Sequence, residues 1–446
     1  MNGPRILAVA TASVAVVFAG ITVTALRTPS SPLDRASESV PVRMEGGAYI
    51  QRLGDCVACH SVPKGAPFAG GLKMETPLGA IYSTNITPDR ETGIGNYTLA
   101  EFDNAVRRGV ARDGHRLYPA MPYPSYAKIS DDDIRKLYDY FMHTARPVRQ
   151  ENRVPDIPPL LRVRWPLALW NWVFVNDARY VVKPEQDAVW NRGAYLVQGL
   201  GHCGSCHTPR GIAFQEKGLD ESSTAYLSGA VLDGWYASNL RGDAKGGLGN
   251  WSEADIVSFL RTGRNAHAAV YGSMLEVFNN STQFMSDADL NAVARYLKSL
   301  PPNGALAVPS RADSNTTTAF EQSNFSAPGS AIYMERCASC HAANGGGRGG
   351  LLAPLAANSS ITGADAASLI NVILNGSPAP VVDGMPGSYR MPAFRVILSD
   401  QEIADVATFV RTGWGNDSSP VTSNQVRALR GSTRKADIRS YSLPTN

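Results

Sequence analysis

Cys56-Val57-Ala58-Cys59-His60 is the stretch that decides the fold, because the same pattern of two cysteines and a histidine occurs three times. The second copy is Cys203-Gly204-Ser205-Cys206-His207, and the third is Cys337-Ala338-Ser339-Cys340-His341. The chain has six cysteines, and the three copies contain all of them. In this pattern both thiols bond the vinyl groups of a haem, and the histidine binds its iron. The sequence therefore predicts three covalently attached haem c groups.

The length and the charge agree with a chain of this kind. A length of 446 residues corresponds to about three domains at roughly 150 residues each. The net charge is only +3, so nucleic acid is not an expected partner. Because covalent haem attachment requires the oxidising side of a membrane, we expect the protein on the periplasmic side of the bacterial cytoplasmic membrane.

The N-terminal segment is expected to direct export. Residues 6–26 form an apolar run between two arginines, long enough to cross a bilayer and longer than a usual signal core. Val23-Thr24-Ala25 resembles a cleavage site, so a cleaved signal and a retained anchor both stay open. The Ser/Pro-rich residues 28–42 favour a tether. Residues 1–43 are thus predicted to be a signal or membrane anchor with its tether.

Three segments repeat one helical plan. Gly47-Ala48-Tyr49, Gly193-Ala194-Tyr195 and Ala331-Ile332-Tyr333 precede the three cysteine motifs. A middle helix follows in each repeat, with capping boxes at Thr98 and Ser252 and expected ends at Gly109, Gly263 and Gly376. A last helix is expected to start after Ser130, Ser286 and Ser399.

The predicted fold is all-α, with three tandem cytochrome c-type haem domains and an N-terminal apolar signal or anchor helix. The domains are expected at 44–150, 186–302 and 325–416. A Pro/Trp-rich connector (151–185), a linker (303–324) and a basic tail (417–446) complete the layout.

Methionine is the usual distal ligand of an electron-transfer haem, because its soft thioether raises the potential. The repeat register selects Met121, Met274 and Met391, each between the end of the middle helix and the start of the last helix. Met285 and Met385 are rivals that lie out of register. The expected iron ligands are therefore His60 with Met121, His207 with Met274, and His341 with Met391.

Four other histidines remain alternative ligands in principle: His115, His143, His202 and His267. His267 competes most directly, since it precedes Met274 closely. A packed or exposed histidine is the alternative role for each.

Three haems with two protein ligands each would have no open position for a substrate. Such a chain carries electrons, and we expect no catalytic residue of its own. No nucleotide-binding glycine motif and no further cysteine indicates another cofactor. A peroxidase or terminal-reductase type of multihaem protein, and a soluble shuttle cytochrome, are the alternatives.

Several stretches resemble the tri-haem cytochrome c subunits of bacterial membrane-bound dehydrogenases. They include residues 76–89, Tyr118-Pro119-Ala120-Met121-Pro122, Arg164-Trp165-Pro166-Leu167-Ala168-Leu169-Trp170 and Met391-Pro392-Ala393-Phe394. The resemblance covers about residues 44–430. The family serves alcohol, aldehyde, gluconate, sorbitol and fructose dehydrogenases.

The resemblance implies that this chain accepts electrons from a periplasmic catalytic subunit and relays them to ubiquinone in the cytoplasmic membrane. The implied partner is a molybdenum, PQQ or flavin dehydrogenase subunit, with or without a third small subunit. Within the family, the aldehyde or alcohol class is expected. The tail after Trp414 is shorter than that of some alcohol dehydrogenase cytochromes, so the tail and the apolar N-terminal segment favour an aldehyde dehydrogenase with a molybdenum subunit.

The Trp-rich stretch 165–174 has three interpretations. It could lie at a membrane interface, border a quinone site, or be a linker packed between haem domains.

Overall fold

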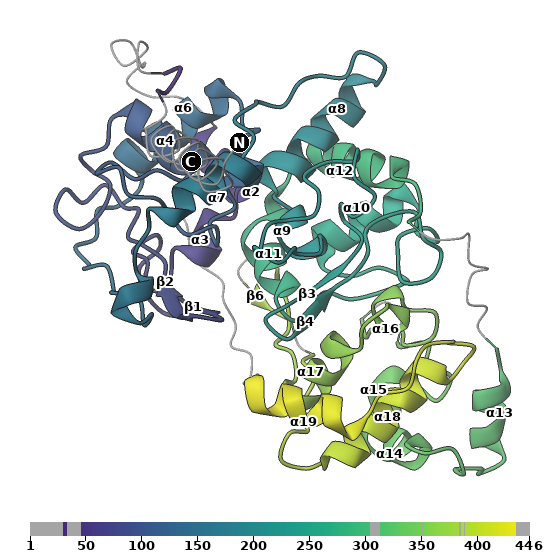
Figure 1. Cartoon of the computed structure of the whole chain (residues 1–446). Helices are drawn as coiled ribbons and strands as arrows, with labels where there is room; N and C mark the ends of the chain where they lie inside the picture. Colours follow the sequence, from purple (N-terminus) through teal and green to yellow (C-terminus); the bar gives the residue numbers. More distant parts are fainter. Residues whose placement is uncertain are drawn as a thin grey trace, which may run out of the picture. The chain divides into compact units, whose positions relative to one another are not determined.

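The computed structural model describes residues 30–33, 46–303, 313–348, 351–382, 385–387 and 389–433. Within them the chain is mainly helical, with three antiparallel two-stranded hairpins (Figure 1). The predicted helical fold class is confirmed in this main feature. Contacts divide the chain into two compact units, Met1–Ile50 with Phe68–Val181 and Gln51–Pro67 with Val182–Asn446. These two units do not correspond to the three predicted haem domains, which were defined by sequence repeats. The division into three domains therefore stays a prediction.

The first unit contains one hairpin and a set of short helices. Helix α2 (Gly47–Leu53) crosses its boundary. The other elements are β1 (Lys73–Thr76), β2 (Gly79–Tyr82), α4 (Leu99–Arg108), α5 (Tyr123–Tyr126), α6 (Asp131–Asp139), the π-helical turn η1 (Tyr140–Thr144), the 3-10 turn η2 (Pro159–Leu161) and α7 (Pro166–Phe174).

The second unit contains the remaining helices and two hairpins. Its elements as far as the end of the second repeat are α3 (Cys56–Cys59), α8 (Ala188–Tyr195), η3 (Leu196–Leu200), α9 (Gly204–His207), β3 (Ala230–Leu232), β4 (Trp235–Ala237), α10 (Glu253–Thr262), α11 (Met274–Asn280), η4 (Thr282–Phe284) and α12 (Asp287–Ser299). The later elements are α13 (Asn315–Glu321), α14 (Ser330–Arg336), α15 (Ala338–His341), α16 (Ser359–Thr362), α17 (Ala367–Asn375), β5 (Val381–Val382), β6 (Met385–Pro386), α18 (Asp400–Thr412) and α19 (Ser423–Ser432).

The predicted helix boundaries are confirmed. Thr98 and Ser252 each form a complete capping box at the start of α4 and α10. Gly109 and Gly263 end these two helices in the left-handed conformation that glycine adopts without steric cost. Side-chain caps from Ser130, Ser286 and Ser399 start α6, α12 and α18, the last helix of each repeat.

A glycine in each repeat lets its first helical segment cross the last helix at very close range. A Cβ added to each glycine would meet a backbone carbonyl oxygen of the last helix. The distance would be 2.4 Å from Gly47 to the oxygen of Lys136, 1.9 Å from Gly193 to that of Ala292, and 2.3 Å from Gly329 to that of Asp405. In every case the carbonyl belongs to the sixth residue after the serine cap of the last helix. The three repeats therefore share one helix crossing.

This crossing corrects the alignment of the third repeat. The match of Ala331-Ile332-Tyr333 to Gly47-Ala48-Tyr49 is wrong in register, because Gly329 makes the equivalent contact. Gly329 has a positive φ of 81° and precedes α14, whereas Gly193 lies inside α8. A tyrosine lies two residues after Gly47 and after Gly193 but four residues after Gly329, so matching the tyrosines misaligns the glycines.

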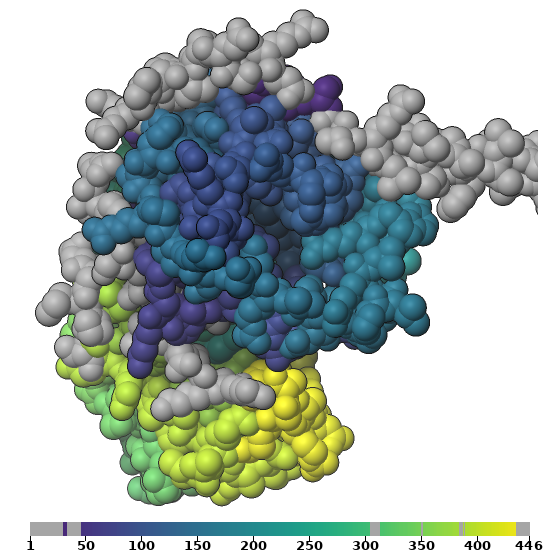
Figure 2. Space-filling view, turned by 90° about the vertical axis from the view of Figure 1, so that its left-hand side faces the viewer, coloured from purple at the N-terminus to yellow at the C-terminus, as the bar shows by residue number. Residues whose placement is uncertain are grey.

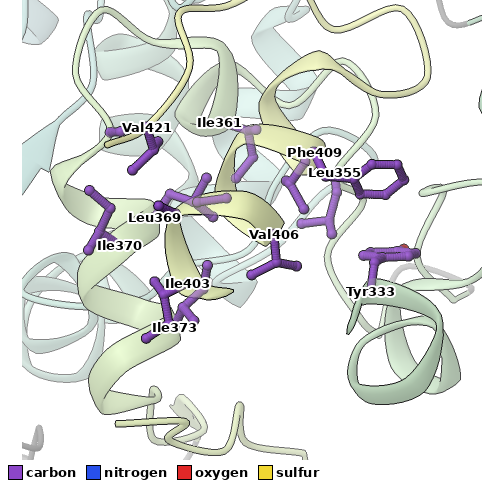
Figure 3. Packing of buried hydrophobic residues seen from close by; sticks show 14 of the residues in the cluster. Tyr333, Leu355, Ile361, Leu369, Ile370, Ile373, Ile403, Val406, Phe409 and Val421 are labelled. Carbon is purple, nitrogen blue, oxygen red and sulfur yellow. The ribbon is translucent and has the colours of Figure 1, made fainter. Parts of the chain in front are cut away.

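The core of the third repeat lies between α14, α17 and α18 (Figure 3). Tyr333, Phe409 and Trp414 form an aromatic group with ring centroids 4.9–5.4 Å apart. Ile370 and Ile403 are almost fully buried in the same cluster. The Trp414 indole also donates to the Ala343 carbonyl, which ties the end of α18 to the chain after the third motif.

Of the two predicted end segments, the structure describes the C-terminal one in part, and the N-terminal one only at its attachment, residues 30–33. The predicted signal or anchor run lies outside the described residues. Part of the predicted basic tail is helix α19, which packs on α17 and α18 through the fully buried Val426. Arg430 donates to Asp400 at 2.7 Å in the same contact. No helix among the described residues combines the length and the apolar character needed to cross a membrane.

Candidate haem-binding sites

Each cysteine motif forms a single short helical turn. The histidine amide donates to the carbonyl of the first cysteine in all three, at 3.0 Å for His60 and His207 and 2.9 Å for His341. Residues at positions i, i+3 and i+4 of a helix share one face. The turn therefore brings both thiols and the imidazole of each motif to the same side, as attachment to one haem requires.

The imidazoles of His207 and His341 are held in a ligating orientation. Nδ1 of His207 lies 2.6 Å from the Ser238 carbonyl oxygen, and Nδ1 of His341 lies 2.9 Å from that of Ala353. A carbonyl can only accept, so Nδ1 carries the proton and Nε2 keeps its lone pair for a metal. Burial lowers the pKa of both histidines, so both are neutral at pH 7.

The first cysteine of each motif has a thiol that is uncharged at pH 7. Burial, with a contribution from Asp55 and Cys59, raises the pKa of Cys56 to about 12. Burial also raises the pKa of Cys203 to about 12 and that of Cys337 to about 11. Buried neutral thiols of this kind do not favour disulfide exchange or thiolate–metal binding. They are compatible with thioether bonds, which carry no charge.

A buried polar atom beside the second motif fits a bound haem. The Tyr226 hydroxyl is buried and has no hydrogen-bond partner among the described residues. Its ring lies against Gly204, where a Cβ would come within 3.1 Å of the ring edge. Since buried hydroxyls normally have a partner, this one fits a polar group absent from the protein itself. The residues of the second site therefore fit a haem.

Met121 and Met274 occupy matching places in their repeats. The amides of Leu117 and Val270 donate to the carbonyls of Gly109 and Gly263 at 2.8 and 2.7 Å. Each methionine is the fourth residue after that amide. Both methionines are half-buried, and Met274 packs beside Val270 in a small apolar cluster.

Met391 is placed differently. It pairs with Ser377 through two backbone hydrogen bonds of 3.1 Å, directly after the end of α17. Its side chain packs against the core cluster of the third repeat, and so does that of Cys337. The structure therefore brings Met391 and the third motif to one apolar core, and the methionine ligands themselves stay predictions.

The first predicted pair is divided between the two compact units. His60 belongs to the second unit and Met121 to the first, so each is described in its own unit. The rival Met285 is buried beside the start of α12. The backbone of Met385 forms strand β6.

The alternative histidine ligands have protein partners of their own. His267 stacks on Trp251 with ring centroids 5.3 Å apart, and its Nε2 lies 3.3 Å from Asp255. His143 contacts Asp139 at 2.9 Å, and His115 contacts Asp113. His202 directly precedes the second motif, and its Nδ1 lies 2.9 Å from the Leu200 carbonyl oxygen. These contacts occupy one ring nitrogen of each histidine.

The first attachment segment packs beside the helix that begins with Met274. Helix α3 contacts α11. The Arg52 guanidinium lies 3.9 Å from the centroid of the Phe284 ring and donates to the Asn280 carbonyl at 3.4 Å. Burial and the nearby Glu276 raise the pKa of Asp55, which precedes the first motif. The segment 51–67 thus belongs with the second repeat.

The second and third repeats share a polar contact. The Tyr236 amide donates to Ser368 Oγ at 2.7 Å, and Ser368 Oγ donates to the Tyr236 carbonyl at 2.9 Å. Ser238, whose carbonyl holds His207, also reaches Ser360 Oγ at 3.4 Å. Strand β4 therefore connects the second motif to α16 and α17.

Sequence reasoning missed the residues that orient the histidines. Ser238 belongs to the stretch Tyr236-Ala237-Ser238-Asn239, which matches Tyr82-Ser83-Thr84-Asn85 of the first repeat. That repetition is the signal that could have identified it. Ala353 acts only through its backbone carbonyl, for which the sequence holds no signal.

Comparisons with known proteins identify the family of the chain. The cytochrome c family model matches residues 326–414. The gluconate 2-dehydrogenase cytochrome c subunit of Pantoea cypripedii is 49% identical over 89% of this chain and 91% of its own length. The cytochrome c subunit of alcohol dehydrogenase (quinone) from Gluconobacter oxydans (strain 621H) is 45% identical, over 89% of this chain and 84% of its length. The fructose dehydrogenase cytochrome subunit of Gluconobacter japonicus is 34% identical over 96% of this chain and 90% of its own length. The chain thus belongs to the family of cytochrome c subunits of gluconate, alcohol and fructose dehydrogenases.

Proposed function

We propose that this chain carries electrons from a periplasmic dehydrogenase subunit to ubiquinone in the cytoplasmic membrane. Its residues would hold three haem c groups through Cys56 and Cys59, Cys203 and Cys206, and Cys337 and Cys340. The iron ligands would be His60 with Met121, His207 with Met274, and His341 with Met391. Each haem, when bound, supplies reversible one-electron Fe(III)/Fe(II) chemistry.

The observation that carries the proposal is the fixed orientation of the motif histidines. The Ser238 and Ala353 carbonyls fix Nδ1–H of His207 and His341 and present Nε2 for ligation. Two protein ligands at every iron would leave no position for a peroxide or an organic substrate. The residues then bind and tune redox groups, and substrate chemistry belongs to another polypeptide.

The partner is proposed from the relatives. The three relatives reported above are subunits of gluconate, alcohol and fructose dehydrogenases, so we propose a catalytic subunit of this group. The aldehyde class remains an expectation from the sequence alone. Purification with the native partner, followed by assay for molybdenum, PQQ and flavin, identifies the partner's cofactor.

Carbon monoxide binding to the reduced protein tests the methionine ligands. The wild-type protein should bind none without unfolding, whereas Met274→Leu should bind about one equivalent because its iron loses a ligand. Met285→Leu is the matched control, since this buried methionine lies near the same repeat but out of register. Stoichiometric binding to the wild-type protein would contradict the proposal and favour a peroxidase-like site.

The relay itself is tested in the purified complex. Substrate should reduce all three haems, and a ubiquinone analogue should reoxidise them. Haems that are reoxidised by peroxide but not by quinone would overturn the proposed electron acceptor.

A further inference from the structure

The Pro/Trp-rich connector is firmly attached to the first unit. Asn171, buried on the inner side of α7, accepts a hydrogen bond from the Tyr123 hydroxyl at 2.8 Å and donates to the Arg108 carbonyl at 3.0 Å. The Trp170 ring meets the Tyr123 ring edge-on, with centroids 6.1 Å apart. Before α7, the Asp156 amide donates to the Ala80 carbonyl of β2. The connector is therefore a built part of this unit rather than a loose linker.

The outer side of the connector is apolar and exposed to solvent. We call this surface the connector face, and its exposed members are Leu160, Leu161, Val163, Trp165, Trp172 and Val173. Leu160 is 89% exposed and Trp172 is 56% exposed. Residues of the connector, coloured blue to teal, form part of the surface in Figure 2. A helix that is apolar on all sides is normally buried. The exposed apolar side of α7 therefore indicates a surface that binds an apolar partner, such as a protein or a membrane.

The charges within the part of the connector that carries the connector face favour an anionic partner surface. Residues 157–176 contain two arginines, Arg162 and Arg164, and no acidic residue. Arg164 lies over the Tyr118 ring, 4.2 Å from its centroid, and donates to the Arg116 carbonyl at 3.1 Å. Tryptophan side chains concentrate at the headgroup level of a bilayer, and arginines there interact with anionic lipids.

The length of α7 excludes a membrane-spanning role. Its nine residues extend over roughly 14 Å, less than half of a bilayer core of about 30 Å. An apolar helix of this size can lie in the plane of the interface instead.

The attachment point of the N-terminal tether lies next to the connector. Ser31 donates to Asp103 at 2.7 Å, and Arg108 donates to the same carboxylate oxygen at 2.6 Å. Asn171 of α7 binds the carbonyl of that arginine. The predicted apolar run ends at Leu26, so the chain from it to Ser31 can extend at most roughly 18 Å. A retained N-terminal anchor would thus leave the bilayer close to the connector face.

We propose that the connector face lies in the headgroup region of an anionic bilayer, with the tryptophans at its centre. The proposal rests on the membrane location contained in the proposed function. It goes further by naming the surface that meets the lipid.

The experiment uses the full chain with its haems in vesicles of phosphatidylethanolamine and phosphatidylglycerol. All six cysteines belong to haem motifs, so a nitroxide can be attached to one introduced cysteine in Val173→Cys. Val189→Cys is the matched control, because it is also an exposed helical valine. The accessibility of each label to oxygen and to a nickel chelate is measured with the haems reduced.

Vesicles should raise the oxygen-to-nickel accessibility ratio several-fold at position 173 and leave it unchanged at position 189. Adding Trp165→Ser and Trp172→Ser should restore access of the nickel chelate to position 173, while the visible spectrum still shows three haems. These readings report depth, so binding through the N-terminal run alone does not reproduce them.

Equal nickel access at positions 173 and 189 in vesicles would overturn the inference. Protection at 173 that requires the catalytic subunit and not lipid would also overturn it, and would identify a protein-docking surface instead. If reduction by substrate and reoxidation by quinone persist in either case, the proposed function stands and only the membrane surface is wrong.

Discussion

Replacing Gly193 by alanine should destabilise the second repeat, because α8 and α12 cross there without room for a side chain. A Cβ would lie 1.9 Å from the Ala292 carbonyl oxygen and 2.8 Å from Tyr296 Cβ, so the helices must separate locally by about 1 Å. A gap of this size removes about a quarter to a half of the dispersion energy at each affected contact.

The contacts at risk are specific. The Trp190 and Tyr296 rings meet edge-on with centroids 5.1 Å apart, and Arg192 binds Asp289 through two hydrogen bonds of 2.7 and 2.9 Å. Overpacking costs about 1–3 kcal/mol, and alanine returns up to about 1 kcal/mol of helix propensity. Since the obstacle is a backbone carbonyl, we expect a net loss near ~2 kcal/mol, or about 30-fold in the opening equilibrium.

Native-state hydrogen exchange of α8 and α12 measures this loss directly. It suits a chain of several repeats, for which one global unfolding free energy is not defined. Gly431→Ala is the control, because a Cβ there meets nothing within 4 Å and protection should not fall. Unchanged protection in both helices of Gly193→Ala, with three haems attached, would refute the close crossing.

Three further substitutions test the buried ion pairs of the first unit, the half-exposed Asp131 and the aromatic core of the third repeat. Asp103→Ala should destabilise the first unit by about 3–5 kcal/mol in denaturant titrations, because the buried Arg107 and Arg108 lose their shared carboxylate. Hydrogen bonds from Arg107 and Arg179 outweigh burial and lower the pKa of Asp131. Its stabilising effect should therefore be present above pH of about 4 and vanish as pH falls below it, which unfolding of Asp131→Asn against wild type at each pH will show. Phe409→Ala should cost about 3–5 kcal/mol in the third repeat, measured by exchange of α18 amides, because the side chain leaves a cavity in the aromatic group.

The sequence predicted the helix ends well because side-chain chemistry determines them locally. Thr98 and Ser252 satisfy backbone amides of their own helices, and Gly109 and Gly263 adopt a conformation that most residues avoid. The short hairpins were not foreseen, since a strand such as Lys73–Thr76 has no fully buried face to produce an alternating pattern.

Other features depend on pairs of residues that are distant in the chain. The role of Gly329 depends on its close contact with the Asp405 carbonyl, which is distant in the chain. The sequence repeat instead matches Ala331 with Gly47 and Gly193. The carbonyls of Ser238 and Ala353 orient histidines through backbone atoms that every residue possesses. Side-chain motifs therefore sufficed to predict the haem attachment sites, whereas the groups that orient their histidines required the structure.

Hydrogen bonds between side chains and backbone join the second and third repeats. Ser368 binds both backbone groups of Tyr236, and Gln283 donates to the Val381 carbonyl at 2.8 Å, in addition to the covalent connection through the predicted linker 303–324. Ser238 takes part on the second-repeat side and also holds the second motif histidine. A shift at the contact between Ser238 and Ser360 would thus also move His207, the predicted iron ligand of the second motif. The two repeats are for this reason better regarded as one packed body than as two separate domains joined by a linker.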